Sequence, residues 1–204
     1  KKIYGYKMTK FLGEYTLSHP TMCDDLIDYF KNNSSKSYAG AIYEDGESMV
    51  KKDIKDSTDM AITIGENTLI DAYANEAQIC LDKYKKDYKY SDEGQSPYNI
   101  IEDINIQHYS PGQAFHKWHC EKSGSYYSLR HLVFMTYLND VTDKGGTEFY
   151  YHNICIAPKK GLTLIWPTDW TFTHRGITSP TQEKYIITGW YSYVNRNAGV
   201  LNEF

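Results

Sequence analysis

The sequence predicts a mainly β (α+β) fold, in which a β-sandwich or jelly-roll core follows supporting helices. Two observations lead to this prediction. Apolar residues recur every three or four positions only in the first half of the chain, which is the spacing of amphipathic helices. From Ile100 onward they alternate with polar residues in short runs between turn residues, which is typical of antiparallel strands. This order indicates helices packed on one outer face of a β core.

The length, net charge and apolar content of the chain limit its possible organisation and partners. A length of 204 residues fits a single domain, 1–204, with helical support and N-terminal strands in 1–95, the β core in 96–197 and a tail in 198–204. The net charge of −4 argues against a non-specific nucleic-acid binder, which needs a basic face. No run reaches the ~20 apolar residues of a membrane span. We therefore expect neither nucleic acid nor a membrane as a partner.

The four cysteines, Cys23, Cys80, Cys120 and Cys155, show no Cys-x-x-Cys spacing. A structural zinc site is therefore not expected. Free thiols in a chain of this size fit a reducing compartment, and the first residues lack the apolar run of a secretory signal. The expected location is the cytoplasm.

A first helix is expected directly after Pro20, with Ser18 or Thr21 as its N-cap. Met22, Leu26 and Phe30 fall on one face of this helix, and acidic residues occupy its first turns. An Asn-Asn-Ser-Ser run ends it. The following residues, through about position 50, are expected to be irregular or to form short strands around a Glu-Asp-Gly turn.

A longer helix is expected after Gly65. Its end, Lys83–Tyr90, is basic and aromatic, which would also suit a nucleic-acid contact. We favour a solvated helix end, because lysines there complement the helix dipole. The residues that keep the helical spacing are Leu69, Tyr73, Ala77, Cys80, Leu81, Tyr84 and Tyr88.

The second half is predicted to contain eight strands. Pro-Gly, Asp-Lys-Gly-Gly and Pro-Lys-Lys-Gly turns separate several of them, and strands this short and closely spaced indicate a sandwich or jelly roll. The candidates are Asp103–Tyr109, Ala114–Glu121, His131–Leu138, Thr147–Tyr151, Ile154–Ala157, Leu162–Trp166, Phe172–His174 and Lys184–Val194.

The most informative short motif is His119-x-Glu121. Residues two apart on a strand share a face, so these two side chains point the same way. His116 would point to the other face, which makes it a poor chelating partner on a strand. His174 lies 55 residues after His119 (174 minus 119). Two imidazoles and one carboxylate are the ligand set of a facial iron(II) site.

The last predicted strand places Lys184, Ile186, Thr188 and Trp190 on one face. A lysine that points inward with apolar neighbours requires a negative partner. The sequence names no protein carboxylate for it, so the carboxylate of a ligand is a natural candidate. The alternative is a flipped register, with Lys184 at the exposed start of the strand.

An ordered series of residues between about Ile100 and Val194 matches a known pattern. Its members are Tyr109-x-Pro111-Gly112-Gln113, His119-x-Glu121, Arg130, Tyr137-Leu138-Asn139, Gly145-Gly146-Thr147-x-Phe149, Lys160-Gly161, His174, Lys184 and Thr188-x-Trp190. In order, and nearly in spacing, the series resembles the 2-oxoglutarate/Fe(II)-dependent dioxygenases, and in particular the prolyl 4-hydroxylase-like group. The resemblance implies a double-stranded β-helix, a cupin-like form of jelly roll.

The resemblance also implies cofactors and residue roles. His119 and His174 would bind Fe(II), with Glu121 in place of the family's usual aspartate. The cosubstrate would be 2-oxoglutarate, used with O2 and with ascorbate as a reductant. Lys184 and Tyr137 would bind the distal carboxylate of 2-oxoglutarate. Tyr109 and Thr188 complete the residues that we expect at the cosubstrate.

The resemblance suggests a prolyl residue in a peptide or protein as the substrate, hydroxylated with release of succinate and CO2. Arg130 and Trp190 match positions on the substrate side. Trp118 and Tyr127 add aromatic area, on which proline-rich segments dock, and the loop 122–128 has the Gly and Ser content of a mobile lid. Two alternatives stay open: the same chemistry on a free amino acid or other small molecule, and a non-catalytic jelly-roll binding module with an altered metal site.

Arg130 and Tyr137 impose a condition on their strand. They are seven residues apart, so a regular strand places them on opposite faces. Both can face one site only if the strand contains a bulge, or if Arg130 lies at its very start.

Overall fold

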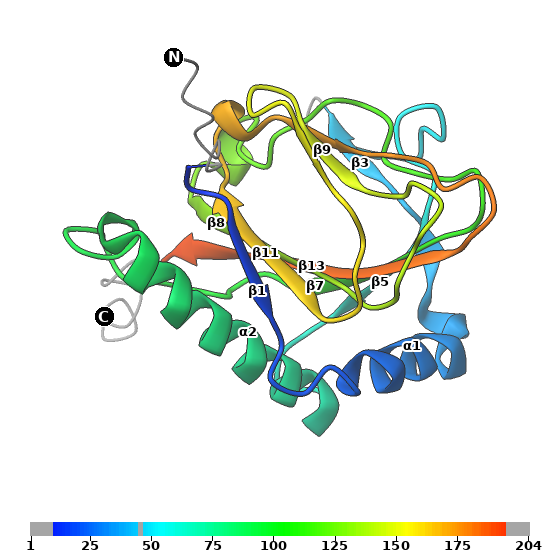
Figure 1. The fold of residues 1–204 in the computed structure, drawn as a ribbon, viewed down its shortest axis with the longest axis horizontal. Helices are drawn as coiled ribbons and strands as arrows, with labels where there is room; N and C mark the ends of the chain where they lie inside the picture. The colour runs from blue at the N-terminus through cyan, green and yellow to red at the C-terminus, as the bar shows by residue number, and fades with distance from the viewer. Residues whose placement is uncertain (1–9, 45–46, 195–204) are drawn as a thin grey trace, which may run out of the picture.

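The computed structural model describes residues 10–44 and 47–194, and one large antiparallel sheet forms its centre. The predicted tail 198–204 lies outside this part of the chain, and the single-domain division stays a prediction. Figure 1 shows the large sheet curving around the middle of the molecule. In order across the sheet, its strands are β1 (Gly13–Thr16), β11 (Leu162–Pro167), β8 (Arg130–Tyr137), β13 (Lys184–Tyr193), β7 (Ile104–Tyr109), β5 (Thr58–Ile62) and β2 (Tyr38–Ala39), with β6 (Tyr98–Asn99) paired to β13.

A second, three-stranded sheet lies across from the large one, as the position of its central strand in Figure 1 shows. Its strands, in order, are β10 (Ile154–Ile156), β9 (Thr147–Phe149) and β12 (His174–Gly176). Val133, Met135 and Leu164 of the large sheet share one buried cluster with Phe149 and Ile156 of the small sheet. This sheet-on-sheet core confirms the predicted jelly-roll class.

A separate hairpin joins β3 (Ile42–Glu44) to β4 (Glu47–Met49); residues 45–46 of its predicted turn lie outside the described residues.

Both predicted helices are present and pack on the outer face of the large sheet, where Figure 1 shows them side by side. They are α1 (Met22–Asn32) and α2 (Thr68–Asp87). Thr21 takes the N-cap position of α1 but makes no side-chain capping bond, whereas the Asn67 side chain caps α2. No helix in the described ranges is long and apolar enough to cross a membrane. Short 3-10 turns lie at η1 (Ser34–Lys36), η2 (Lys89–Ser91), η3 (Ser125–Tyr127) and η4 (Trp170–Phe172).

The prediction of a strand over Ala114–Glu121 is wrong. This segment is irregular and touches its neighbours only at isolated bridges, among them His119 to His174. Its backbone bonds are divided between two partners, because Ala114, His116 and Lys117 bond to residues 54–56, whereas Phe115 and His119 bond to β12. A ladder requires one continuous partner, so alternating composition does not produce a strand here.

The predicted strand Phe172–His174 is displaced. Trp170–Phe172 forms the 3-10 turn η4, closed by a bond from the Thr173 hydroxyl to the Trp170 carbonyl, and β12 begins only at His174. The strand therefore starts at the residue where we expected it to end.

The strand of Arg130 meets both alternatives that the spacing allowed, because Arg130 starts β8 and a bulge separates it from Leu132. Tyr191 pairs with Leu132, whereas the next residue of β13, Ser192, pairs with Arg130, so β8 carries one extra residue between them. An extra residue reverses the alternation of faces. Arg130 thereby joins Tyr137 on the side of the sheet that faces the small sheet.

The layer between α2 and the large sheet yields a stability prediction. Ile70→Ala should lower the free energy of unfolding by about 2–5 kcal/mol, because Ile70 is fully buried and the change leaves a cavity. Ile79→Ala makes the same change on the same helix at a side chain that is 41% exposed, and should change stability by no more than about 0.5 kcal/mol. Urea denaturation of both variants measures the difference; equal losses would contradict the assigned burial.

Candidate metal centre

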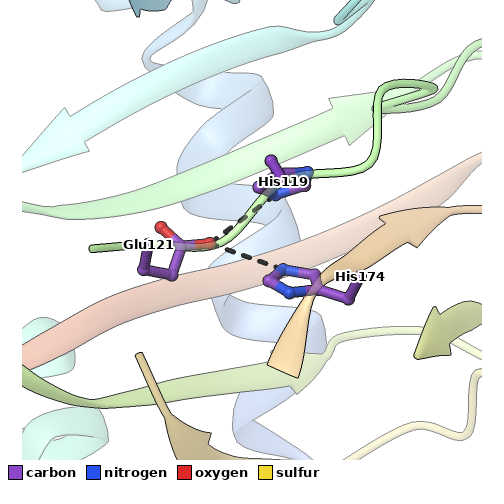
Figure 2. A group of neighbouring side chains, drawn as sticks. All are labelled: His119, Glu121 and His174. Carbon is purple, nitrogen blue, oxygen red and sulfur yellow. Dashed lines mark ion pairs between the residues drawn. The ribbon is translucent and has the colours of Figure 1, made fainter. Parts of the chain in front are cut away.

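Three predicted ligand residues meet at one point between the two sheets. His119 lies in the irregular segment, Glu121 follows two residues later, and His174 opens β12. Their ligand atoms all lie within 4.8 Å of one another, and Figure 2 shows the Glu121 carboxylate pointing at both rings. Two backbone bonds hold the histidines together, from His119 N to His174 O (3.0 Å) and from His174 N to His119 O (2.9 Å).

The orientation of each imidazole is fixed by the residue two positions before it. His119 Nδ1 lies 2.9 Å from the carbonyl oxygen of Lys117, and His174 Nδ1 lies 2.9 Å from that of Phe172. A carbonyl oxygen only accepts, so both Nδ1 atoms donate. Each neutral ring then presents an unprotonated Nε2, the atom that binds a metal.

The carboxylate spacing fits a metal ion. Oε1 of Glu121 lies 3.6 Å from His119 Nε2 and 3.4 Å from His174 Nε2. Donors about 2.1 Å from one ion and at right angles to each other would lie about 3 Å apart. Small side-chain movements would therefore bring all three onto a common ion, although Glu121 is one methylene longer than aspartate.

The protonation states suit metal binding as well. Burial and the neighbouring His174 lower the pKa of His119 to about 3. Burial raises the pKa of Glu121, but its contact with His174, then its electrostatic interactions with both histidines and Arg130, outweigh this effect and lower the pKa to about 2. At neutral pH the site therefore offers a neutral imidazole and a carboxylate anion, the forms that coordinate a metal.

Aromatic side chains pack around the two imidazoles. The Phe115 ring stacks on His119 with centroids 3.7 Å apart and planes 10° from parallel. Trp166 and Phe149 lie 5.1 and 5.5 Å from the His174 ring. These contacts restrict ring rotation and keep the back of the site apolar.

The three residues line a cavity of about 740 Å³ that also contains Lys184. All four residues predicted to share the inner face of β13, from Lys184 to Trp190, line this cavity, so the predicted register is confirmed. Lys184 is 4% exposed, and its Nζ donates to the Gly145 carbonyl oxygen at 2.8 Å. Within the described ranges no carboxylate pairs with it. Burial lowers the pKa of Lys184 to about 8.

The other predicted cosubstrate residues differ in placement. Tyr109 and Thr188 line the cavity, with Tyr109 donating to the Gln107 side chain at 2.7 Å. Tyr137 does not line it. Its hydroxyl donates to Thr147 Oγ1 at 2.6 Å, and Thr147 occupies the wall instead. A direct bond from Tyr137 to a ligand, as the resemblance implies, is therefore not what this structure presents.

All four residues predicted for the substrate side line the cavity. Arg130 lies between two rings, 3.8 Å from the centroid of Tyr127 and 3.6 Å from that of Trp190. Trp118 packs against Arg175, whose guanidinium lies 4.3 Å from its ring centroid.

His116 is separate from the metal site. It lines a different, smaller pocket of about 270 Å³, together with Arg175 and Lys144. The prediction that His116 does not chelate with His119 agrees with this placement, although the segment is not the strand on which we based it.

The charged residues of the cavity wall that were not predicted are Lys55, Asp59, Glu102, Asp103 and Lys117. Lys55 and Asp59 form a buried ion pair of 2.5 Å, and Glu102 bonds Arg130. Lys55 sits in a Lys- and Asp-rich stretch typical of a solvated surface, so no signal marked it. Asp59 lies in Thr58–Ile62, where three apolar residues follow it in a row, so no alternation marked its side chain as buried.

The fold and the site together define a jelly-roll protein with a His–Glu–His metal centre inside the barrel. Residues 104–192 match the family model described as the 2OG-Fe(II) oxygenase superfamily. The matched segment contains His119, Glu121, His174 and Lys184, and the match confirms the resemblance seen in the sequence. No curated protein sequence matches the chain.

Several solved structures share the fold. A viral collagen prolyl hydroxylase from Paramecium bursaria Chlorella virus-1, in its 2OG complex, is 21% identical with a TM-score of 0.66, over 93% of this chain and 100% of that chain. A Pseudomonas putida prolyl-4-hydroxylase is 13% identical with a TM-score of 0.69, over 89% and 92%. A Trichoplax adhaerens prolyl hydroxylase, in complex with a hypoxia-inducible-factor peptide fragment, is 15% identical with a TM-score of 0.68, over 90% and 84%. At these identities the comparison demonstrates a shared fold.

The geometry predicts which histidines bind a divalent metal. His174→Ala should weaken Mn²⁺ binding by more than the about 10- to 100-fold that loss of a supporting partner costs, because it removes a ligand outright. His116→Ala is the matched control, since it deletes a nearby imidazole that lies in the other pocket. Isothermal titration of both variants with Mn²⁺ measures the effect. Equal affinities for the two variants would contradict the assigned site.

Proposed function

We propose that the chain is an Fe(II)- and 2-oxoglutarate-dependent dioxygenase that hydroxylates a prolyl residue in a peptide or protein. The observation that carries the proposal is Lys184, a buried lysine with no carboxylate partner in the described residues. It lines the same cavity as the His119–Glu121–His174 set. The three metal-ligand residues and the ammonium group of Lys184 line one cavity. This arrangement suits a ligand that chelates a metal at one end and carries a carboxylate at the other.

Each part of the site has a role in this proposal. His119, His174 and Glu121 would hold Fe(II), leave it a net charge of +1 and keep its opposite face open for other ligands. Together, iron, 2-oxoglutarate and O2 would supply the oxidising chemistry: one oxygen atom of O2 enters the C–H bond to give an alcohol and the other enters succinate, with release of CO2. The aromatic rings that pack on the imidazoles would hold the ring directions at the metal position.

Lys184 would hold the distal carboxylate of 2-oxoglutarate. Its ammonium group is held in place by the Gly145 carbonyl and lies 4.8 Å from the centroid of the Tyr109 ring. A charge-assisted bond is strong where water is excluded. Thr188 and Thr147 line the same cavity and offer hydroxyl groups, with Tyr137 supporting Thr147 from behind.

A peptide substrate is supported by the aromatic lining of the cavity. Trp118, Tyr126 and Tyr127 all line it, and Tyr126 is 73% exposed. Proline-rich segments bind aromatic-lined grooves, because extended proline conformers lose little entropy on docking. The prolyl substrate is further supported by the fold, which the chain shares with prolyl hydroxylases from a virus, a bacterium and an animal.

Turnover of 2-oxoglutarate tests the proposed activity. The protein, reconstituted with Fe(II) and ascorbate, should form succinate, and proline-rich peptides should stimulate the reaction and gain one oxygen atom by mass spectrometry. His174→Ala should abolish both signals, because it removes a metal ligand. Succinate formation that no peptide stimulates would contradict the peptidyl substrate alone. Absence of metal binding and turnover would instead support a non-catalytic binding module.

The depressed pKa of Lys184 predicts how cosubstrate affinity depends on pH. Below pH 8 the ammonium is charged both free and bound, so the Kd of 2-oxoglutarate should stay constant. Above pH 8 the free lysine is neutral, while the bound carboxylate raises its pKa, so binding must take up a proton. The Kd should then rise by up to about tenfold per pH unit. Titration of the Mn²⁺-loaded protein between about pH 6.5 and about pH 9.5 measures this dependence.

Lys184→Met provides the control for this dependence. It should bind 2-oxoglutarate more weakly at every pH and show no change of slope near pH 8, because no titrating group remains at that position. A change of slope that persists in Lys184→Met would assign the effect to another group.

A further inference from the structure

The two oxygen atoms of Glu121 have different partners. Oε1 faces the two histidines, whereas Oε2 accepts a hydrogen bond from Trp190 Nε1 at 2.9 Å. Arg130 Nη1 lies 3.6 Å from the same Oε2 and 3.4 Å from the Glu121 backbone carbonyl oxygen. The carboxylate is therefore held at one oxygen by the indole and guanidinium, and presents the other to the metal position.

Arg130 is itself fixed on all sides. The rings of Tyr127 and Trp190 enclose its guanidinium, and its Nε bonds both carboxylate oxygens of Glu102 at 3.0 and 3.1 Å. Glu102 is anchored in turn by the Ser192 hydroxyl at 3.0 Å. Arg130 is 7% exposed, and a guanidinium that is stacked twice and ion-paired is poorly placed to turn toward a substrate.

The contacts with Trp190 and Arg130 restrict the extra rotatable bond that a glutamate side chain has compared with aspartate. The glutamate side chain has one more methylene than aspartate, which adds a rotatable bond and about 1.5 Å of reach. Without a second anchor, the carboxylate would occupy several rotamers, and ordering it on the metal would cost entropy. The bond from Trp190 selects the rotamer in which Oε1 faces both imidazoles.

We propose that Trp190 and Arg130 are positioning residues that hold Glu121 as a one-oxygen metal ligand. Both were expected on the substrate side; this inference moves them to the support of the metal centre and rests on the metal site of the proposed function. A glutamate is long enough to reach the metal position with one oxygen and Trp190 with the other. An aspartate in its place would be too short to reach the metal position and Trp190 together.

A double-mutant cycle tests this coupling. Trp190→Phe keeps the ring that stacks on Arg130 but removes the N–H donor, and should weaken Mn²⁺ binding about tenfold in the otherwise unchanged protein. In a Glu121→Asp background, the same change should alter Mn²⁺ affinity by less than about twofold, because the shorter carboxylate no longer reaches the indole. Isothermal titration gives the affinities. The visible spectrum of the Co²⁺-loaded protein should also shift in the Trp190→Phe variant, because the position of the Glu121 carboxylate at the metal changes.

Two controls separate positioning from general structure. Trp170→Phe makes the same chemical change at an indole that is 63% exposed, and should leave Mn²⁺ affinity unchanged. Thermal unfolding of the metal-free variants shows whether each one folds. If Trp190→Phe does not fold, Arg130→Lys replaces it: this change keeps the charge but loses the stacked planar group, and should also weaken Mn²⁺ binding about tenfold.

The outcomes distinguish this inference from the proposed function. Wild-type Mn²⁺ affinity in a folded Trp190→Phe or Arg130→Lys variant would overturn the positioning role while leaving the dioxygenase proposal intact. An equal loss from Trp190→Phe with Glu121 present and in the Glu121→Asp background would likewise overturn it. Absence of Mn²⁺ binding in the unsubstituted chain would overturn both proposals.

Discussion

The backbone pairing of His119 with His174 is the interaction on which the site depends. Two hydrogen bonds join residues that are 55 positions apart (174 minus 119), and each imidazole then bonds a carbonyl two residues before it. The same local geometry thus appears twice, once in an irregular segment and once at the start of β12. The carbonyl oxygens of Lys117 and Phe172 orient the two imidazoles, and the carboxylate of Glu121 is the third ligand group of the site. The pairing forms because β12 is the outer strand of the small sheet, and the segment around His119 lies beside it.

Charge is distributed unevenly along the cavity wall, and that asymmetry indicates where ligands bind. Most buried charges are matched inside the protein: Lys55 by Asp59, and Arg130 by Glu102 and Glu121. Lys184 is the contrast, since a carbonyl oxygen is its hydrogen-bond partner and burial lowers its pKa. A buried lysine without a counter-ion weakens the folded state. Its position in the same cavity as the metal ligands gives that cost a functional explanation.

The segment 114–121 brings His119 and Glu121 together without forming the predicted strand. We expected a strand there and inferred from its alternation that His119 and Glu121 share a face. The segment is irregular, because its backbone bonds go to residues 54–56 on one side and to β12 on the other. The two side chains nevertheless converge, since both are directed toward His174 by contacts across the barrel. Sequence spacing identified the residues, while tertiary contacts set their directions.

Local patterns in the sequence determined the two helices, most of the strands and the inward face of Lys184, because hydrophobic periodicity and turn residues act over short distances. For Arg130 and Tyr137, seven residues apart, the sequence allowed either a bulge or a strand start at Arg130, and β8 has both. Only the tertiary structure decided how Glu121 is used. Its second oxygen is bound by Trp190, 69 residues later, and by Arg130, whose own partner Glu102 precedes it by 28 residues. Such partners are chosen by packing across the barrel, and no local pattern along the chain records that choice.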